Sequence, residues 1–143
     1  MDPTDFLVVA QNLHPSALEA ERRTSISRSY YALYNLLHEA LSSVGVSLSR
    51  NAEDHRLLVY YLTHCRPPAP ATGVGLALNS LRTARNIADY DMRATVDAKQ
   101  SEFAYKRALE DFGKFKALDQ RALDNLARCI QYLPPPPRST NRP

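Results

Sequence analysis

Residues 17–44, ALEAERRTSISRSYYALYNLLHEALSSV, decide the fold class. No proline interrupts this segment, and Gly45 follows it, as glycine often follows the end of a helix. At 100° per residue one apolar stripe runs along the segment, formed by Ile26, Tyr30, Leu33, Leu37, Ala40 and Val44. The spacing predicts one long helix over 17–44 whose stripe lies in the core.

A second row of side chains lies beside the stripe, centred about 120° away. Its members are Arg23, Ser27, Tyr31, Tyr34 and His38. A solvent-facing row on a bundle helix usually holds lysine and glutamate, whereas this row holds two tyrosines, a serine, an arginine and a histidine. Tyrosines on helices often pack in the core with the hydroxyl at the rim. The row therefore indicates either a core margin, or an interface or cleft.

Helical spacing and turn residues predict further helices over 4–12, 51–66, 72–91 and 97–133. Asp97 and Gln100 have the spacing of a capping box, and Gly113 is the weak point of the last helix. Arg66–Pro70 is predicted to be a loop. Since strand-like alternation of useful length is missing, the sequence predicts an all-α, antiparallel bundle of four to five helices. It forms a single domain over 1–133, followed by a proline-rich, disordered tail over 134–143.

The helix over 72–91 also has two faces. Its predicted core stripe is Ala77, Leu81, Ala84, Ala88 and Met92, with Arg85 and Asp89 one turn apart at the edge. Asn79, Thr83, Asn86, Ile87 and Tyr90 point largely away from the stripe. An exposed isoleucine and tyrosine indicate a second contact, most simply with a twin subunit. Arg85 and Asp89 alone could be an ordinary surface pair worth about 0.3 kcal/mol.

Composition limits the classes of function. A chain of 143 residues with 44% hydrophobic and 23% charged residues suits one globular domain. The net charge is +3, and because the tail holds two arginines and no acid, about +1 remains on the rest. Nucleic-acid surfaces usually show clustered basic stripes. The global charge therefore does not decide the function.

The two cysteines, Cys65 and Cys129, have no CxxC spacing. They predict reduced thiols in a cytoplasmic protein, with neither a disulfide nor a zinc site. No apolar run approaches the roughly 20 residues that cross a bilayer, so no membrane contact is expected. A glycine-rich phosphate loop, HExxH and GxSxG are all missing from the sequence, which predicts no metal and no cofactor.

Three elements together resemble the HEPN family: Ser29-Tyr30-Tyr31-Ala32, His55-Arg56, and Arg85-Asn86-Ile87-Ala88-Asp89-Tyr90-Asp91. The resemblance covers approximately residues 6–112. It implies a bundle of four or five helices that dimerises across the helix bearing the arginine motif. Many members are metal-independent endoribonucleases of toxin–antitoxin or phage-defence systems, and others pair with a small nucleotidyltransferase.

In active members an arginine, the polar residue after it and a histidine four to six residues on assist attack of the ribose 2′-hydroxyl on the adjacent phosphate. Carried over, Arg85 is the phosphate-binding arginine and Asn86 its polar neighbour, but no histidine follows. The candidate catalytic residues are Arg85, Asn86, Asp89 and Tyr90, and the candidate binding residues are Arg23, Ser27, Tyr31, Tyr34, His38 and Arg82. His38 either substitutes in space for the missing histidine or is an ordinary interface or surface histidine.

Two functions follow from this resemblance. In the first, the chain is a binding or regulatory module for RNA, a nucleotide or a nucleotidyltransferase partner in a toxin–antitoxin or defence system. In the second, it is a metal-independent endoribonuclease whose motif lacks the usual histidine. The missing histidine favours the first, and the Arg85-Asn86 pair keeps the second open. In both, a homodimer is expected.

Overall fold

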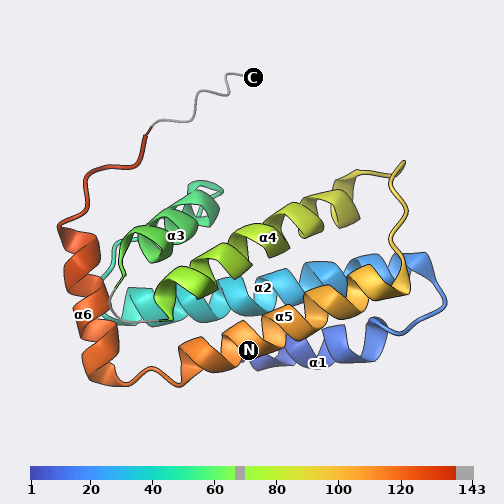
Figure 1. Ribbon diagram of the computed structural model, residues 1–143, viewed down its shortest axis with the longest axis horizontal. Coiled ribbons are helices and arrows are strands. Elements are labelled where there is room, and N and C mark those ends of the chain that lie inside the picture. The colour runs from blue at the N-terminus through green and yellow to red at the C-terminus, as the bar shows by residue number, and fades with distance from the viewer. Residues whose placement is uncertain (67–69, 138–143) are drawn as a thin grey trace.

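The computed structural model describes residues 1–66 and 70–137, and its regular structure there consists of helices alone. These are α1 (Thr4–Leu13), α2 (Glu19–Ser43), α3 (Glu53–His64), α4 (Ala71–Tyr90), α5 (Ala98–Lys116) and α6 (Gln120–Gln131) (Figure 1). The all-α class is confirmed, although the described residues form six helices where four to five are predicted. No helix in this part of the chain is long and apolar enough to cross a membrane.

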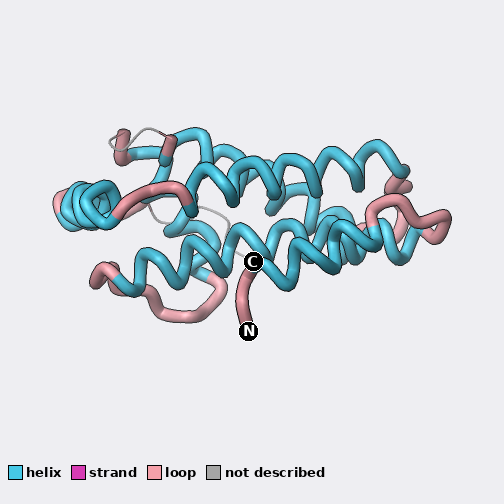
Figure 2. The backbone as a smooth tube through the Cα atoms, turned by 90° about the horizontal axis from the view of Figure 1, so that it is seen from below, coloured by secondary structure: helices cyan, strands magenta, loops and turns pink. Residues whose placement is uncertain are grey.

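The central helix is α2, which packs against α1, α4 and α5 (Figures 1 and 2). The predicted stripe is buried at four positions, and Ala40 and Val44 are partly buried. Ser27 and Tyr34, from the row beside the stripe, are buried as well. Because helices cover α2 on several sides, its buried surface is wider than one stripe. Gly45 ends the helix with φ +89°, a conformation that suits glycine.

The helix that carries the arginine motif, α4, packs against α2, α3 and α5. It approaches α3 closely at Gly75, where a Cβ atom would lie 2.8 Å from Cβ of Leu62. Its buried residues are Ala71, Val74, Gly75, Ala77, Leu78, Leu81 and Ala88. Met92 does not belong to the core stripe: it follows the end of the helix and is 71% exposed. The five residues predicted to face outward are exposed.

The predicted last helix is two helices. Gly113 lies inside α5, and the helix is interrupted between Lys116 and Gln120 instead. The Asp119 carboxylate caps α6 by accepting a hydrogen bond of 2.8 Å from the Ala122 amide. The capping box at the start of α5 is present as predicted. In Figure 1, α6 crosses one end of the bundle.

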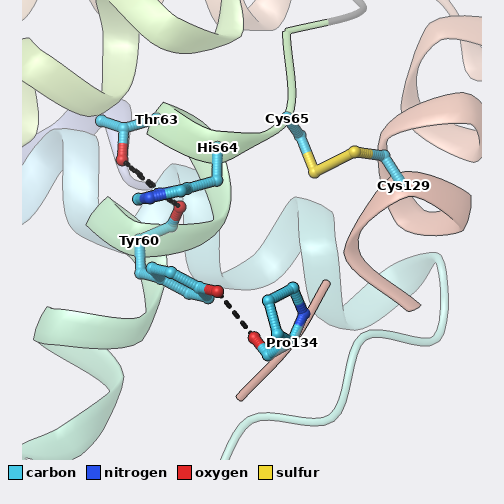
Figure 3. Close-up of a disulfide and its surroundings, with 6 residues drawn as sticks. All are labelled: Tyr60, Thr63, His64, Cys65, Cys129 and Pro134. Carbon is cyan, nitrogen blue, oxygen red and sulfur yellow. Dashed lines mark hydrogen bonds between the residues drawn. A yellow bond between two sulfur atoms is a disulfide. The ribbon is translucent and has the colours of Figure 1, made fainter. Parts of the chain in front are cut away.

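The cysteine prediction is wrong, because Cys65 and Cys129 form a disulfide. Their Cα atoms lie 5.9 Å apart, so the bond joins the end of α3 to α6 (Figure 3). Spacing in the sequence could not show that these two helices meet. Disulfides persist mainly in oxidising compartments, so the cysteines do not support the predicted cytoplasmic setting.

The beginning of the proline-rich tail lies along α3. The Tyr60 hydroxyl donates a hydrogen bond of 2.6 Å to the Pro134 carbonyl (Figure 3), and the Arg56 guanidinium donates one of 2.7 Å to the Pro137 carbonyl. Residues 138–143, predicted to be disordered, lie outside the described residues, as do residues 67–69 of the predicted loop. The described part of the tail therefore has defined partners on α3.

Candidate functional site

Arg85 lies at the centre of a polar and aromatic cluster where α4 crosses α2. Its Nε donates a hydrogen bond of 2.9 Å to Oδ2 of Asp89, one turn further along α4. Its Nη2 donates one of 2.7 Å to the hydroxyl of Tyr31 on α2. Both bonds are partly buried, and they hold the guanidinium in one orientation. We call the group of Ser27, Tyr30, Tyr31, Arg85, Asn86, Asp89 and Tyr90 the Arg85 cluster.

Three tyrosine rings surround the guanidinium of Arg85. Its Cζ lies 5.1 Å from the ring centroid of Tyr31, 5.2 Å from that of Tyr90 and 5.9 Å from that of Tyr30. A guanidinium within about 6 Å of an aromatic ring gains roughly 0.5–1 kcal/mol at an exposed site, and more when it is desolvated. The three rings therefore restrict the orientation of the Arg85 guanidinium further and keep its positive charge next to them.

Asp89 ties the cluster to the core of the bundle. Its Oδ2 accepts the bond from Arg85 and a second one, of 3.1 Å, from the hydroxyl of Ser27. Ser27 is only 4% exposed, whereas the Asp89 side chain is 27% exposed. The pair of Arg85 and Asp89 is therefore more than an isolated surface ion pair, because it also links α4 to α2.

On its outer side the Arg85 guanidinium makes two further hydrogen bonds, and 16% of its side chain is exposed. Nη1 donates a bond of 3.1 Å to the side-chain oxygen of Asn86, and Nη2 donates one of 3.3 Å to the hydroxyl of Tyr90. Both bonds are exposed, as are Asn86 and 70% of Tyr90. A guanidinium has five N–H donors, and Nη1 keeps one that these bonds do not use. An anionic oxygen can therefore bind at Nη1 without breaking the two inner bonds.

His55, at the start of α3, lies against the inner side of the cluster. Its Nδ1 is hydrogen-bonded to the hydroxyl of Tyr30, and its ring stacks at 4.3 Å on Tyr34. Burial, together with the positive charges of Arg82 and Arg85, lowers the pKa of His55 below its usual 6.5. His55 is therefore a neutral imidazole at neutral pH.

Tyr30 and Tyr34, the two buried tyrosines that contact His55, are neutral as well. Burial raises the pKa of the Tyr30 hydroxyl well above its usual 10.0. Burial, with the nearby Asp54 carboxylate, also raises the pKa of Tyr34. The Tyr30 hydroxyl is therefore a neutral hydrogen-bonding partner of His55, and the rings of both tyrosines pack against His55.

His38 has a different set of contacts. Its Nε2 lies 2.9 Å from Oδ2 of Asp54, and its ring centroid lies 5.7 Å from that of Tyr34. Asp54 is fully buried and also accepts bonds from Ser49 and from the Arg50 amide. Burial alone would raise the pKa of Asp54, but these hydrogen bonds hold it below its usual 3.8. His38 thus anchors the loop before α3, and its contacts are with Asp54 and Tyr34.

Two predicted binding residues lie at the edges of this region. The Arg23 guanidinium donates hydrogen bonds to main-chain carbonyls at the end of α4, at 3.0 Å for Ala88 and 2.9 Å for Asp91. It therefore caps the helix that carries the motif. Arg82 is half-buried on α4, close enough for its charge to lower the pKa of His55.

The structure thus brings together Ser27, Tyr31, Arg85, Asn86, Asp89 and Tyr90 from the predicted set. Tyr30 and His55 belong to the elements that resemble the HEPN family, but they are not among the candidate site residues predicted from the sequence, and neither is Arg28, whose Cζ lies 5.4 Å from the Tyr31 ring centroid. The adjacent tyrosines at 30 and 31 were the available signal, because neighbouring residues on a helix point about 100° apart and so face two different partners.

The described residues contain no group of three or more histidine, cysteine or acidic side chains that could hold a metal ion. No protein-family model matches the chain, and neither a curated protein nor a solved structure matches it. The site must therefore be interpreted from its own geometry.

Proposed function

We propose that this chain binds single-stranded RNA at the Arg85 cluster, as a binding or regulatory module of a toxin–antitoxin or defence system. The observation that carries the proposal is the division of Arg85 into two sides. Its inner bonds to Asp89 and Tyr31 fix the guanidinium, and its outer bonds go to the exposed side chains of Asn86 and Tyr90. The system itself is inferred only from the HEPN resemblance.

The chemistry of the exposed edge suits an unpaired nucleotide. A fixed guanidinium is a good partner for phosphate oxygens, and the Asn86 amide can donate another hydrogen bond to the same group. Tyr90 exposes its ring next to this position. Proteins that recognise single-stranded RNA combine phosphate contacts with bases stacked on aromatic rings, at about 1–3 kcal/mol per base. A free nucleotide offers the same groups, and a nucleotidyltransferase partner stays a prediction of the resemblance.

The proposal is tested by fluorescence anisotropy with a short, labelled single-stranded RNA of mixed sequence. Arg85→Ala is expected to weaken binding at least about tenfold, since hydrogen bonds to charged groups contribute roughly 1.5–3 kcal/mol. Arg85→Lys keeps the charge but loses the fork, so it should recover only part of the affinity. Arg121→Ala, which removes an exposed arginine from α6, is the matched control. Equal affinities for Arg85→Ala and Arg121→Ala would contradict the proposal.

Tyr90 is tested in the same assay. Tyr90→Phe keeps the ring and should bind almost as the wild type does, whereas Tyr90→Ala should lose about 1–3 kcal/mol of binding free energy. A mononucleotide added as competitor separates the two ligands. If it displaces the RNA at equal concentration, the site recognises a nucleotide and not a strand.

A second candidate function is metal-independent RNA cleavage, which the position of His55 favours. Tyr30 and Tyr31 each contact both residues: their ring centroids lie 5.6 and 6.3 Å from that of His55, and 5.9 and 5.1 Å from Cζ of Arg85. A neutral imidazole can take the proton of a ribose 2′-hydroxyl. The 2′-oxygen would then attack the adjacent phosphorus and break its bond to the 5′-oxygen of the next nucleotide. That oxygen takes a proton from water and leaves as a 5′-hydroxyl, and the other product ends in a 2′,3′-cyclic phosphate.

Incubation of RNA with the protein in EDTA tests this second function. Cleavage with cyclic ends that is lost in His55→Asn and kept in His64→Asn, an exposed histidine of the same helix, would establish it. RNA that stays intact while it binds with the Arg85 dependence described above would leave the binding function alone.

A further inference from the structure

An apolar face with no assigned role lies between α4 and α5. It presents three large exposed side chains, with 54% of Leu76, 42% of Ile87 and 65% of Phe103 accessible. Ile87 follows Arg85 by two residues, which turns it about 200° around α4, away from the Arg85 cluster. The two α4 residues of this face are eleven positions apart, or about 16 Å at 1.5 Å per residue.

A cavity opens on the same face beside Phe103. Its volume is about 180 Å³, and its apolar lining includes Ile26, Leu81, Ala84, Ile87, Val96 and Ala104. An apolar cavity of about 150 Å³ is large enough to bind benzene. The cavity can therefore take one phenyl ring, and the exposed ring of Phe103 is itself part of its lining.

We propose that this face joins two copies of the chain, with Phe103 of each copy inserted into the cavity of the other. A two-fold interface uses the same patch on both subunits, so the patch must carry both the projecting group and its receptor. Phe103 and the cavity meet this requirement within one patch. Aromatic anchors buried in pockets near the centre of an interface typically contribute most of its binding energy.

The charges around the face are balanced, which suits a self-association. On α5, Lys106 pairs with Glu102 at 2.7 Å and Lys114 pairs with Glu110 at 2.9 Å. A rim of one sign would repel its own copy, whereas a rim of paired charges does not. Arg107 lies at the edge of the cavity, where its guanidinium can stack on the incoming phenyl ring. Arginine is enriched at protein interfaces.

Sedimentation equilibrium tests the interface. The wild type is expected at twice the chain mass of 16.1 kDa. Phe103→Ala removes the projecting ring, and Ser80→Phe fills the mouth of the cavity, so each variant alone should be monomeric. Tyr132→Ala removes an exposed ring from the C-terminal end of α6 and should leave the dimer intact.

Mixing the two interface variants gives a sharper test. Phe103→Ala loses one side of the cavity wall but keeps the part that Leu81, Ala84 and Ala104 form, and Ser80→Phe keeps its phenyl ring at 103, so one of the two reciprocal contacts can form between them. A mixture that regains a dimer which neither variant forms alone would establish the reciprocal insertion. A monomeric wild type, or a dimer that survives both single substitutions with the helical circular dichroism unchanged, would overturn the proposal.

Discussion

Breaking the bond between Cys65 and Cys129 is expected to lower the free energy of unfolding by about 4 kcal/mol. The two cysteines are 64 positions apart, and the loop-entropy relation for a closed loop of that length gives about this value. The effect should concentrate at α6, which packs on the rest of the protein through few other residues, chiefly the buried Leu126 and Ile130.

Thermal unfolding followed by circular dichroism measures this effect. For a chain of this size 1 kcal/mol corresponds to about 2–4 °C, so a reductant should lower Tm by roughly 8–16 °C. Cys129→Ser should unfold at the lower temperature and should not respond to the reductant. A wild-type Tm that stays unchanged after the reductant has released two reactive thiols would refute the reasoning.

Three further predictions concern groups around the site. Arg23→Met should lower the free energy of unfolding by about 2 kcal/mol, since charged hydrogen bonds contribute roughly 1.5–3 kcal/mol. It should also speed amide exchange at the end of α4. An unchanged denaturation midpoint would argue against this role of Arg23. The pKa of His55 is lowered below 6.5 by burial first and then by the positive charges of Arg82 and Arg85. His55 therefore binds a proton more readily in the unfolded chain than in the folded one. Stability should therefore fall as the pH drops below about 6.5, and less steeply in His55→Asn; parallel pH profiles from denaturant titrations would contradict this. Burial alone would raise the pKa of Asp54, but its hydrogen bonds hold the pKa below 3.8. The stability that these hydrogen bonds contribute is therefore present above about pH 3.8 and is lost as the pH falls further. Asp54→Asn should flatten this acid limb and cost about 3 kcal/mol at neutral pH, and a variant as stable as the wild type would exclude the role assigned to the carboxylate.

Local periodicity predicted the helices and the directions of their side chains. The stripe on α2 and the outer row on α4 are set by the 100° step between residues, which needs no knowledge of the partner helix. The break before α6 was missed because its cap is weaker in sequence. Asp97 is followed at the third position by Gln100, which completes a capping box, whereas Asp119 is followed at that position by Ala122.

Long-range partners could not be predicted in this way. Periodicity placed Tyr31 and Arg85 beside the apolar stripes of their helices, but it could not predict that the Tyr31 hydroxyl contacts the Arg85 guanidinium. The pairing of Cys65 with Cys129 and the stacking of His55 on Tyr34 have the same origin, since each joins segments whose approach is decided by the packing of the whole bundle. Arg23 was predicted to bind a ligand, but its guanidinium caps α4 instead.

The dependence of RNA affinity on salt tests the central claim most directly. Each phosphate neutralised on a single strand contributes about −0.7 to the slope of log K against log salt concentration. If Arg85 contacts one phosphate, Arg85→Ala should make the slope shallower by about 0.7, while Arg121→Ala should leave it unchanged. Identical slopes for the wild type and Arg85→Ala would contradict the assignment of Arg85 as the phosphate-binding residue.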